Sequence, residues 1–313
     1  MASLLEIDDL SKNFRNQWTF RSFCALADLS FTVNEQEVFG LIGPNGAGKT
    51  TTFKLLLGLL RPTRGCALFL GKPATDSSVR AQIGFLPEQP YFYDYLSVRE
   101  TLEFYGNLCG INATERRERI NSLAERLRLV PKLDAPMRSL SKGMVQRVGV
   151  AQAIIHKPRL VILDEPMSGL DPAGRKEMRE LIRSLKYEGA TVIFSSHILP
   201  DAEALCDRVG ILVDGRLREV LHLTGDNRDS ERRFSMTVSG VPEATLGPLR
   251  DLASEPPQGG PHIWTLTIGD RNGVREALRL LDEKGGVLES LQPKNASLED
   301  RFLAYVDHSI AAD

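Results

Sequence analysis

A glycine-rich loop at residues 43–50 constrains the fold of this chain more than any other feature. It reads Gly-Pro-Asn-Gly-Ala-Gly-Lys-Thr, follows the apolar run Val38–Ile42 and precedes a helical pattern over Phe53–Leu60. A loop of this composition between a strand and a helix is typical of phosphate binding in α/β proteins. Its glycines let successive backbone N–H groups point at phosphate oxygens, and the helix N-terminus adds partial positive charge. We therefore predict an α/β fold with a nucleotide site at this loop.

Each residue of the loop is a candidate ligand of ATP. The set is Gly43, Pro44, Asn45, Gly46, Ala47, Gly48, Lys49, Thr50 and Thr51. We expect Lys49 to reach the β- and γ-phosphates and the Thr50 hydroxyl to bind Mg²⁺. The loop thus predicts a nucleoside triphosphate and Mg²⁺ as cofactors.

Two carboxylates follow the apolar strand predicted at Leu160–Leu163. Asp164 is expected to hold Mg²⁺ through its water shell, because this ion keeps several waters and takes few protein carboxylates. Glu165 would lie near the γ-phosphate, where it could orient or deprotonate the attacking water. Together with the phosphate loop, this pair predicts ATP hydrolysis.

The phosphate loop and the hydrophobic pattern predict a P-loop NTPase core with a mostly parallel sheet, flanking helices and a helical insertion, followed by a small C-terminal α+β domain. In residue numbers, we expect an ATP-binding domain at 1–222 with helices at about 97–155, a linker at 223–232 and the second domain at 233–313. Expected strands are 4–10, 28–42, 66–70, 81–86, 160–163, 191–195, 233–238, 262–268 and 287–291. Expected helices are 53–60, 98–108, 113–129, 142–155, 172–187, 274–283 and 298–306.

Composition predicts that the chain is cytosolic. Its net charge of −2 argues against a dedicated nucleic-acid binder, and its four cysteines are widely scattered, as expected of reduced thiols. No apolar run approaches the roughly 18 residues of a membrane span. The N-terminus has no basic segment of the kind that begins a signal peptide. If the protein acts at a membrane, we expect it to do so from the cytoplasmic face and through a partner.

The segment Leu140-Ser-Lys-Gly-Met-Val-Gln-Arg147 lies between the phosphate loop and the acidic strand end. With them it resembles the ATP-binding subunits of ABC transporters, over roughly residues 3–222. The resemblance implies that the nucleotide is ATP and that the core carries an antiparallel β subdomain. The usual signature loop of that family is Leu-Ser-Gly-Gly-Gln; Ser141 and Gly143 match it, whereas Lys142 and Met144 depart from it. The resemblance implies that Ser141 and the backbone of Gly143 contact the γ-phosphate bound on the opposite subunit. Two subunits would then form two composite sites.

The resemblance carries over four further residues, one at a time. Phe14 takes the position of an aromatic ring that stacks on adenine, although it could equally be a core residue. Gln89 matches the glutamine that senses Mg²⁺ and the attacking water, and Asp171 the loop that couples the two sites. His197 matches the histidine that contacts the γ-phosphate, although a lone histidine is more often structural. The expected catalytic residues are Glu165, His197, Gln89 and Lys49, and the expected metal-binding residues are Thr50, Gln89 and Asp164.

Tyrosines gather just after Gln89. Four of the six in the chain lie between residues 91 and 105, and such rings are common at protein interfaces. The resemblance implies that a membrane subunit docks near Pro90–Tyr105; a locally aromatic core is the alternative. The chain would then be peripheral on the inner face of the cell membrane.

Three functions are compatible with these motifs. The first is the ATPase subunit of a membrane transporter, working as a homodimer or with a related ATPase subunit. The Lys142-Gly-Met, Leu86-Pro-Glu and C-terminal sequences are similar to the drug- and polysaccharide-export branch, and Leu-Pro-Glu is also similar to subunits serving copper-centre maturation of nitrous-oxide reductase. The second is a soluble ABC-type ATPase that acts on nucleic acid or ribosomes, and the third is a nucleotide switch without turnover.

Overall fold

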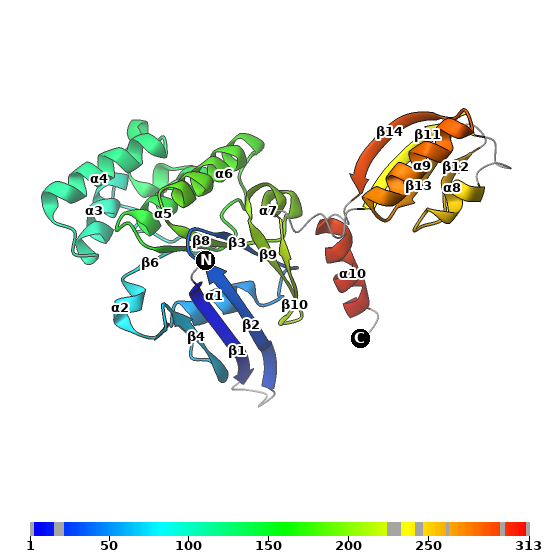
Figure 1. Ribbon diagram of the computed structural model, residues 1–313. Coiled ribbons are helices and arrows are strands. Elements are labelled where there is room, and N and C mark those ends of the chain that lie inside the picture. Colours follow the sequence, from blue (N-terminus) through cyan, green and yellow to red (C-terminus); the bar gives the residue numbers. More distant parts are fainter. Residues whose placement is uncertain are drawn as a thin grey trace. The chain divides into compact units, whose positions relative to one another are not determined.

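The computed structural model describes residues 3–15, 22–223, 233–241, 247–260, 263–294 and 298–310. The chain divides into two compact units, one of Met1–Thr224 with Tyr305–Asp313 and the other of Gly225–Ala304 (Figure 1). Nearly all of the expected linker, residues 224–232, lies outside the described residues. Among the described residues, no helix is both long and apolar enough to cross a membrane.

The larger unit is built on a six-stranded sheet in the order β10-β9-β3-β8-β7-β6. Its strands are β3 (Val38–Ile42), β6 (Ile83–Leu86), β7 (Leu160–Leu163), β8 (Thr191–Ser196), β9 (Arg208–Val213) and β10 (Arg216–His222). All neighbours are parallel except β10 and β9. The buried strands β3, β7 and β8 are continuous apolar runs, because helices cover both faces of such a sheet. The predicted P-loop α/β core is confirmed.

Helices connect these strands. They are α1 (Lys49–Leu56), α6 (Pro172–Tyr187) and α7 (Leu199–Leu205), with α3 (Val98–Leu108), α4 (Ala113–Arg126) and α5 (Lys142–Ile154) between β6 and β7. The last three form the predicted helical insertion, which Figure 1 shows beside the sheet. Short 3₁₀ turns, η1 (Val130–Lys132) and η2 (Met137–Ser139), join α4 to α5. The helix expected at 113–129 ends earlier, at Arg126, because Arg128 has a positive φ of 54° that ends helical geometry.

A second, antiparallel sheet has the order β2-β1-β4-β5. It contains β1 (Ser3–Arg15), β2 (Ser22–Asn34), β4 (Arg64–Phe69) and β5 (Lys72–Pro73), followed by the short helix α2 (Ser77–Arg80). The single strand expected at 28–42 is wrong. The chain turns between Asn34 and Val38, with Gln36 at a φ of 57°, and passes from this sheet to the core sheet.

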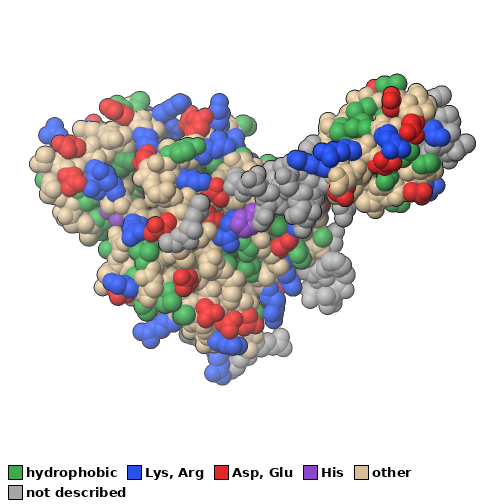
Figure 2. Space-filling view, in the orientation of Figure 1, with side chains coloured by type: hydrophobic (Ala, Val, Ile, Leu, Met, Phe, Trp, Pro, Cys, Tyr) green, Lys and Arg blue, Asp and Glu red, His purple; other side chains and the backbone are tan. Residues whose placement is uncertain are grey.

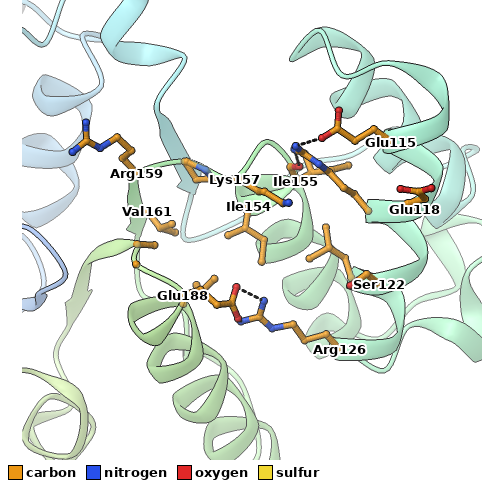
Figure 3. Close-up of a pocket in the computed structure, with 16 residues that line it drawn as sticks. Glu115, Glu118, Ser122, Arg126, Ile154, Ile155, Lys157, Arg159, Val161 and Glu188 are labelled. Atoms are coloured by element: carbon orange, nitrogen blue, oxygen red, sulfur yellow. Dashed lines mark hydrogen bonds and ion pairs between the residues drawn. The ribbon is translucent and has the colours of Figure 1, made fainter.

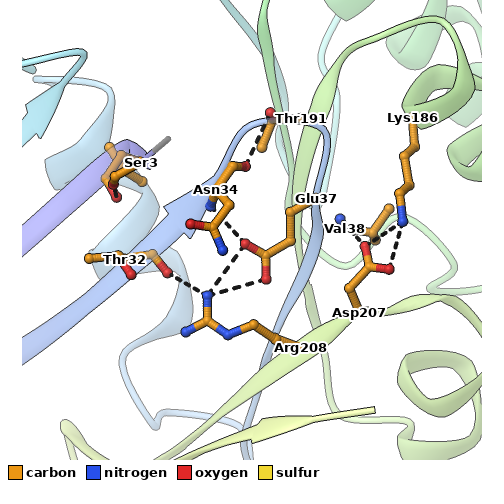
Figure 4. Close-up of polar contacts among 10 residues, drawn as sticks. Ser3, Thr32, Asn34, Glu37, Val38, Lys186, Thr191, Asp207 and Arg208 are labelled. Atoms are coloured by element: carbon orange, nitrogen blue, oxygen red, sulfur yellow. Dashed lines mark hydrogen bonds and ion pairs between the residues drawn. The ribbon is translucent and has the colours of Figure 1, made fainter. Parts of the chain in front are cut away.

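A polar network holds that turn in place (Figure 4). Oε2 of Glu37 accepts the Asn34 N–H at 2.7 Å, and Nη1 of Arg208 lies 3.3 Å from Oε1 of Glu37. Oδ2 of Asp207 accepts the Val38 N–H at 2.8 Å. These contacts join the end of β2 to β3 and β9, and therefore fix the antiparallel sheet against the core sheet.

The smaller unit follows a β-α-β-β-α-β order and has a sheet in the order β12-β13-β11-β14. Its elements are β11 (Arg233–Ser239), α8 (Gly247–Asp251), β12 (Gln258–Gly260), β13 (Ile263–Ile268), α9 (Arg271–Glu283) and β14 (Val287–Lys294). Met236, Leu249, Leu266 and Leu281 form its core with their neighbours. The order is that of a ferredoxin-like α+β unit. The last helix, α10, covers Leu298–Ile310.

Candidate nucleotide-binding site

A cavity of about 450 Å³ lies at the carboxyl ends of the parallel strands of the core sheet. This is the edge at which open α/β sheets bind ligands. The lining residues are Phe14, Phe23, Ala25, Pro44, Asn45, Gly46, Ala47, Gly48, Lys49, Thr50, Thr51, Glu88, Glu165, Ser168 and His197. The structure thus brings most of the predicted loop together with Phe14, Glu165 and His197.

The phosphate loop depends on backbone that only glycine adopts easily. Gly46 and Gly48 have φ values of 83° and 107°, in the region that L side chains avoid. A Cβ on Gly48 would lie 2.6 Å from Cδ2 of Leu26, so there is also no room for a side chain at this position. Lys49 folds back over the loop, where its Nζ donates to the carbonyl oxygens of Gly43 at 2.7 Å and Pro44 at 3.2 Å. The ammonium group is thereby placed where the loop would receive phosphate.

Asp164 is almost fully buried and accepts two hydroxyl hydrogen bonds. Oγ1 of Thr50 donates to Oδ2 at 2.8 Å, and Oγ of Ser195 donates to Oδ1 at 2.7 Å. A hydroxyl and one carboxylate beside a phosphate loop fit Mg²⁺, which prefers oxygen donors and completes its shell with water and phosphate. No group of three or more His, Cys, Asp or Glu side chains that could hold a metal gathers in the described ranges. The donor set therefore fits Mg²⁺ bound together with a nucleotide.

Glu165 is held on both sides. Its Oε1 forms an ion pair with Nζ of Lys49 at 3.3 Å, and its Oε2 lies 2.9 Å from Nδ1 of His197. The backbone N–H of Glu165 donates to Oγ of Ser195 at 2.7 Å, and its φ is 48°. A non-glycine residue in this region carries strain of about 1–3 kcal/mol and is often found at functional sites. The carboxylate is thus fixed in position at the cavity.

In the loop after β6, the residue that lines the cavity is not the one expected. Glu88 and Gln89 are both exposed; Glu88 lines the cavity, whereas Gln89 is not among the lining residues. The role expected of Gln89 toward Mg²⁺ and the attacking water stays a prediction. The sequence reasoning missed Glu88, although Leu86-Pro-Glu repeats the spacing of Leu163-Asp-Glu165.

The signature residues lie outside the cavity of their own chain. Ser141 is the exposed N-cap of α5, and its Oγ accepts the Met144 N–H at 3.4 Å. Asp171 is the exposed N-cap of α6 and accepts the Gly174 N–H at 2.8 Å. Neither they nor Gly143 belong to the lining residues.

Two aromatic residues of the antiparallel sheet also line the cavity. Phe14 and Phe23 are paired across β1 and β2, and their exposed fractions are 38% and 65%. This exposure favours the adenine-stacking role expected for Phe14 over a core role. Phe23 was not predicted, because it lies outside the apolar alternation Leu29, Phe31 and Val33 of β2 and belongs to no motif. Ala25, Ser168 and Ser195 were missed as well.

A larger cavity, of about 740 Å³, lies between α4 and the end of α6 (Figure 3). Several of its charged groups have partners within the chain. Nη2 of Arg126 lies 2.7 Å from Oε1 of Glu188, and Nη1 of Arg119 donates to the Ile155 carbonyl at 2.7 Å. It contains no phosphate loop, so we place the nucleotide in the smaller cavity.

Known proteins are similar to this chain over nearly its whole length. Residues 26–168 match the family model described as ABC transporter. An uncharacterised ABC transporter ATP-binding protein of Synechocystis is 40% identical over 312 residues, which cover 96% of this chain and 84% of that relative. The bacitracin transport ATP-binding protein BcrA of Bacillus licheniformis is 38% identical over 234 residues, which cover 73% and 74%. A solved structure of an ATP-binding subunit of an ABC transporter is 36% identical with a TM-score of 0.64, covering 71% of this chain and 90% of that one.

Proposed function

Because the chain belongs to the ATP-binding proteins of ABC transporters, an ATP-hydrolysing family, we propose that two copies close around two ATP molecules and drive separate membrane subunits. The observation that carries this proposal is the position of Ser141. It is exposed at the start of α5 and lies outside the cavity of its own chain. A second copy, related by a two-fold axis, would bring each Ser141 and Gly143 to the other copy's ATP.

Hydrolysis in this site needs positioning and charge neutralisation rather than a covalent intermediate. Lys49 would neutralise the β- and γ-phosphates from within the loop. Mg²⁺, held by Thr50 and Asp164, would supply further charge when bound. Glu165, oriented by His197 at 2.9 Å, would position the attacking water and accept its proton.

The decisive variant is Glu165→Gln. It should bind ATP but lose most turnover, so that an ATP-bound dimer accumulates. Size-exclusion chromatography with light scattering, with and without ATP, measures this directly. Adding Ser141→Arg to the same variant should abolish the dimer and retain ATP binding. Near-normal hydrolysis by Glu165→Gln would contradict the role of Glu165. An ATP-bound dimer that still forms when Ser141→Arg is present would contradict the composite site.

An exposed aromatic cluster supports docking of a membrane subunit at 90–105. Tyr91, Tyr93 and Tyr95 have exposed fractions of 83%, 50% and 72%. The ring of Tyr93 lies 5.8 Å from that of Tyr95 and 6.2 Å from that of Phe104, between centroids. Such rings supply large contact areas at interfaces.

Replacing both Tyr93 and Tyr95 by Ala should weaken co-purification with the membrane subunit while ATP affinity stays unchanged. Tyr187→Ala is the matched control, because Tyr187 is 87% exposed on α6, outside this cluster. Equal loss in the control and the double variant would count against the docking surface.

We further infer export as the direction of transport and the inner face of the cell membrane as the location. The support is a relative named for bacitracin transport and the export-type sequences around Lys142 and Glu88. A protein or membrane partner is favoured over nucleic acid, because acidic and basic side chains are interspersed on the face of the larger unit that Figure 2 shows. Co-purification of the membrane subunit followed by transport into inverted vesicles would test direction.

A further inference from the structure

We propose that β14, the last strand of the smaller unit, pairs edge to edge with β14 of a second copy of this chain. The contact forms when ATP holds two copies together, so this inference rests on the proposed function. It joins the sheets of the two smaller units into one. The smaller unit thereby strengthens the ATP-bound dimer.

The two edges of this sheet differ in how well they are protected. An edge strand presents a row of unpaired backbone N–H and C=O groups, and proteins usually protect such an edge by shortening or covering it. β12 forms one edge and is only three residues long. β14 forms the other edge, is eight residues long and, within the described ranges, pairs with β11 only. β14 therefore has room for a further strand along its free side.

Apolar side chains of β14 are exposed on both faces of the sheet. Leu288 and Leu291 lie opposite Val238 and Met236 of β11, which belong to the core of the unit. Directly opposed residues point to the same face of a sheet, so both leucines lie on the face that α8 and α9 cover (Figure 1). Each is nevertheless 38% exposed, and Val287, on the other face, is 55% exposed. A second sheet joined at β14 would continue this core and cover these side chains.

The edge of β14 fits a second copy of itself. Two antiparallel strands related by a two-fold axis present the same edge to each other, so residues near the axis face themselves or close neighbours. A charged residue there would be repelled by its counterpart. The middle of β14, residues 290–292, reads Ser-Leu-Gln and carries no charge. Glu289, at the bulge of this strand, is directed toward its own sheet, where it accepts a hydrogen bond from Oγ of Ser239 at 2.5 Å.

Leu291 is at the centre of this neutral segment. A two-fold axis beside it would bring Leu291 against its counterpart and remove both side chains from water. A single pair of strands is a small interface compared with those of stable complexes, so the nucleotide sites are needed to bring the copies together. The pairing of β14 is then intramolecular, and its free energy adds to that of the ATP interface.

The dissociation constant of the ATP-bound dimer measures this contact. In full-length Glu165→Gln with ATP and Mg²⁺, Leu291→Lys should raise this constant by about tenfold or more in sedimentation equilibrium. The reason is that two like charges replace two apolar side chains at the axis. Ile263→Lys is the matched control, because Ile263 is 53% exposed on β13 and β11 separates that strand from β14. It should leave the constant unchanged.

Cross-linking gives a second measurement that does not depend on the folding of the lysine variant. In the same background, the exposed cysteines are first replaced by Ser; they are Cys24, Cys66 and Cys109. Leu291→Cys should then form a disulfide between two copies when copper-phenanthroline is added in the presence of ATP. Ile263→Cys should not form one.

The outcomes separate this inference from the proposed function. An ATP-bound dimer of Leu291→Lys as tight as that of its Glu165→Gln background would overturn the inference, and so would equal cross-linking of Leu291→Cys and Ile263→Cys. A Glu165→Gln variant that forms no dimer with ATP would instead contradict the proposed function.

Discussion

His197 and Glu165 contact each other across the nucleotide cavity, with Nδ1 of the histidine 2.9 Å from Oε2 of the glutamate. The other carboxylate oxygen, Oε1, lies 3.3 Å from Nζ of Lys49. Each oxygen of Glu165 is therefore held by a different residue. We propose that the second ring nitrogen of His197 contacts the γ-phosphate of bound ATP, so that one side chain both orients the base and contacts the nucleotide.

Replacing His197 by Ala should lower kcat by about 100-fold or more, because the carboxylate loses its orienting partner. KM for ATP should change little, since the phosphate loop is intact. Steady-state phosphate release measures both constants. A kcat within threefold of the wild type would contradict the role assigned to His197.

The phosphate loop offers a matched pair of glycine substitutions. Gly48→Ala should abolish ATP binding or destabilise the protein strongly, because its Cβ would approach Cδ2 of Leu26 to 2.6 Å and the Ala25 carbonyl oxygen to 2.9 Å. Gly46→Ala meets nothing within 4 Å and carries only the strain of its positive φ, about 1–2 kcal/mol. Thermal unfolding and ATP titration of both variants test this order. Equal stability and equal ATP affinity of the two variants would show that the steric contact of a Cβ at Gly48 has no effect.

Strong periodicity explains which elements the sequence could predict. The bounds expected for α3, α6 and β7 agree with the structure, because each has a long or fully apolar pattern with clear ends. The break between β2 and β3 was missed, since the turn has neither glycine nor proline and depends on the contact between Glu37 and Arg208, which are distant in sequence. β9 and β10 were missed as well.

The candidate site shows the same division. The phosphate loop and the acidic pair were predictable from local motifs, and most of their residues line the cavity. Which of Glu88 and Gln89 reaches it depends on the register of β6 against β7, and that register is a tertiary property.

Lys142 provides a test of how the signature loop is supported. Its Nζ and Cε lie 2.6 and 2.9 Å from the position that a Cβ on Gly169 would occupy, so the side chain rests on the loop before α6. Lys142→Gly removes this contact and weakens the first turn of α5 by about 1 kcal/mol. In the Glu165→Gln background it should reduce ATP-dependent dimerisation. Lys142→Met keeps most of the stem and should dimerise nearly normally; equal loss in both variants would show that the charge, not the stem, is required.

Glu37 and Arg208 form a largely buried ion pair, with side-chain exposed fractions of 5% and 14%. Glu37→Ala should lower the free energy of unfolding by about 3–5 kcal/mol, because it leaves the charge of Arg208 buried without its partner. Arg64→Ala is the control: Arg64 pairs with Asp9, but its side chain is 68% exposed. Such surface pairs contribute about 0–1 kcal/mol. Urea unfolding of both variants measures the contrast, and equal effects would contradict the argument.

His156, two residues after the end of α5, makes the stability of the larger unit sensitive to acid. Burial lowers the pKa of His156 below the ordinary value of 6.5, with a smaller contribution in the same direction from the charge of Arg119. Its Nδ1 is buried and has no hydrogen-bond partner among the described residues. The unfolded chain therefore takes up a proton at a higher pH than the folded chain. The contribution of His156 to the free energy of unfolding is fully present above pH 6.5. It is lost as the pH falls through the pKa that His156 has in the folded chain.

His156→Gln removes the titrating group and keeps a similar volume. The free energy of unfolding of the wild type should fall more steeply than that of the variant between about pH 7 and pH 5, because only the wild type loses the histidine contribution. Urea unfolding at several pH values gives the two curves. Parallel curves would mean that His156 has the same proton affinity in the folded and unfolded chains, in contradiction to its burial.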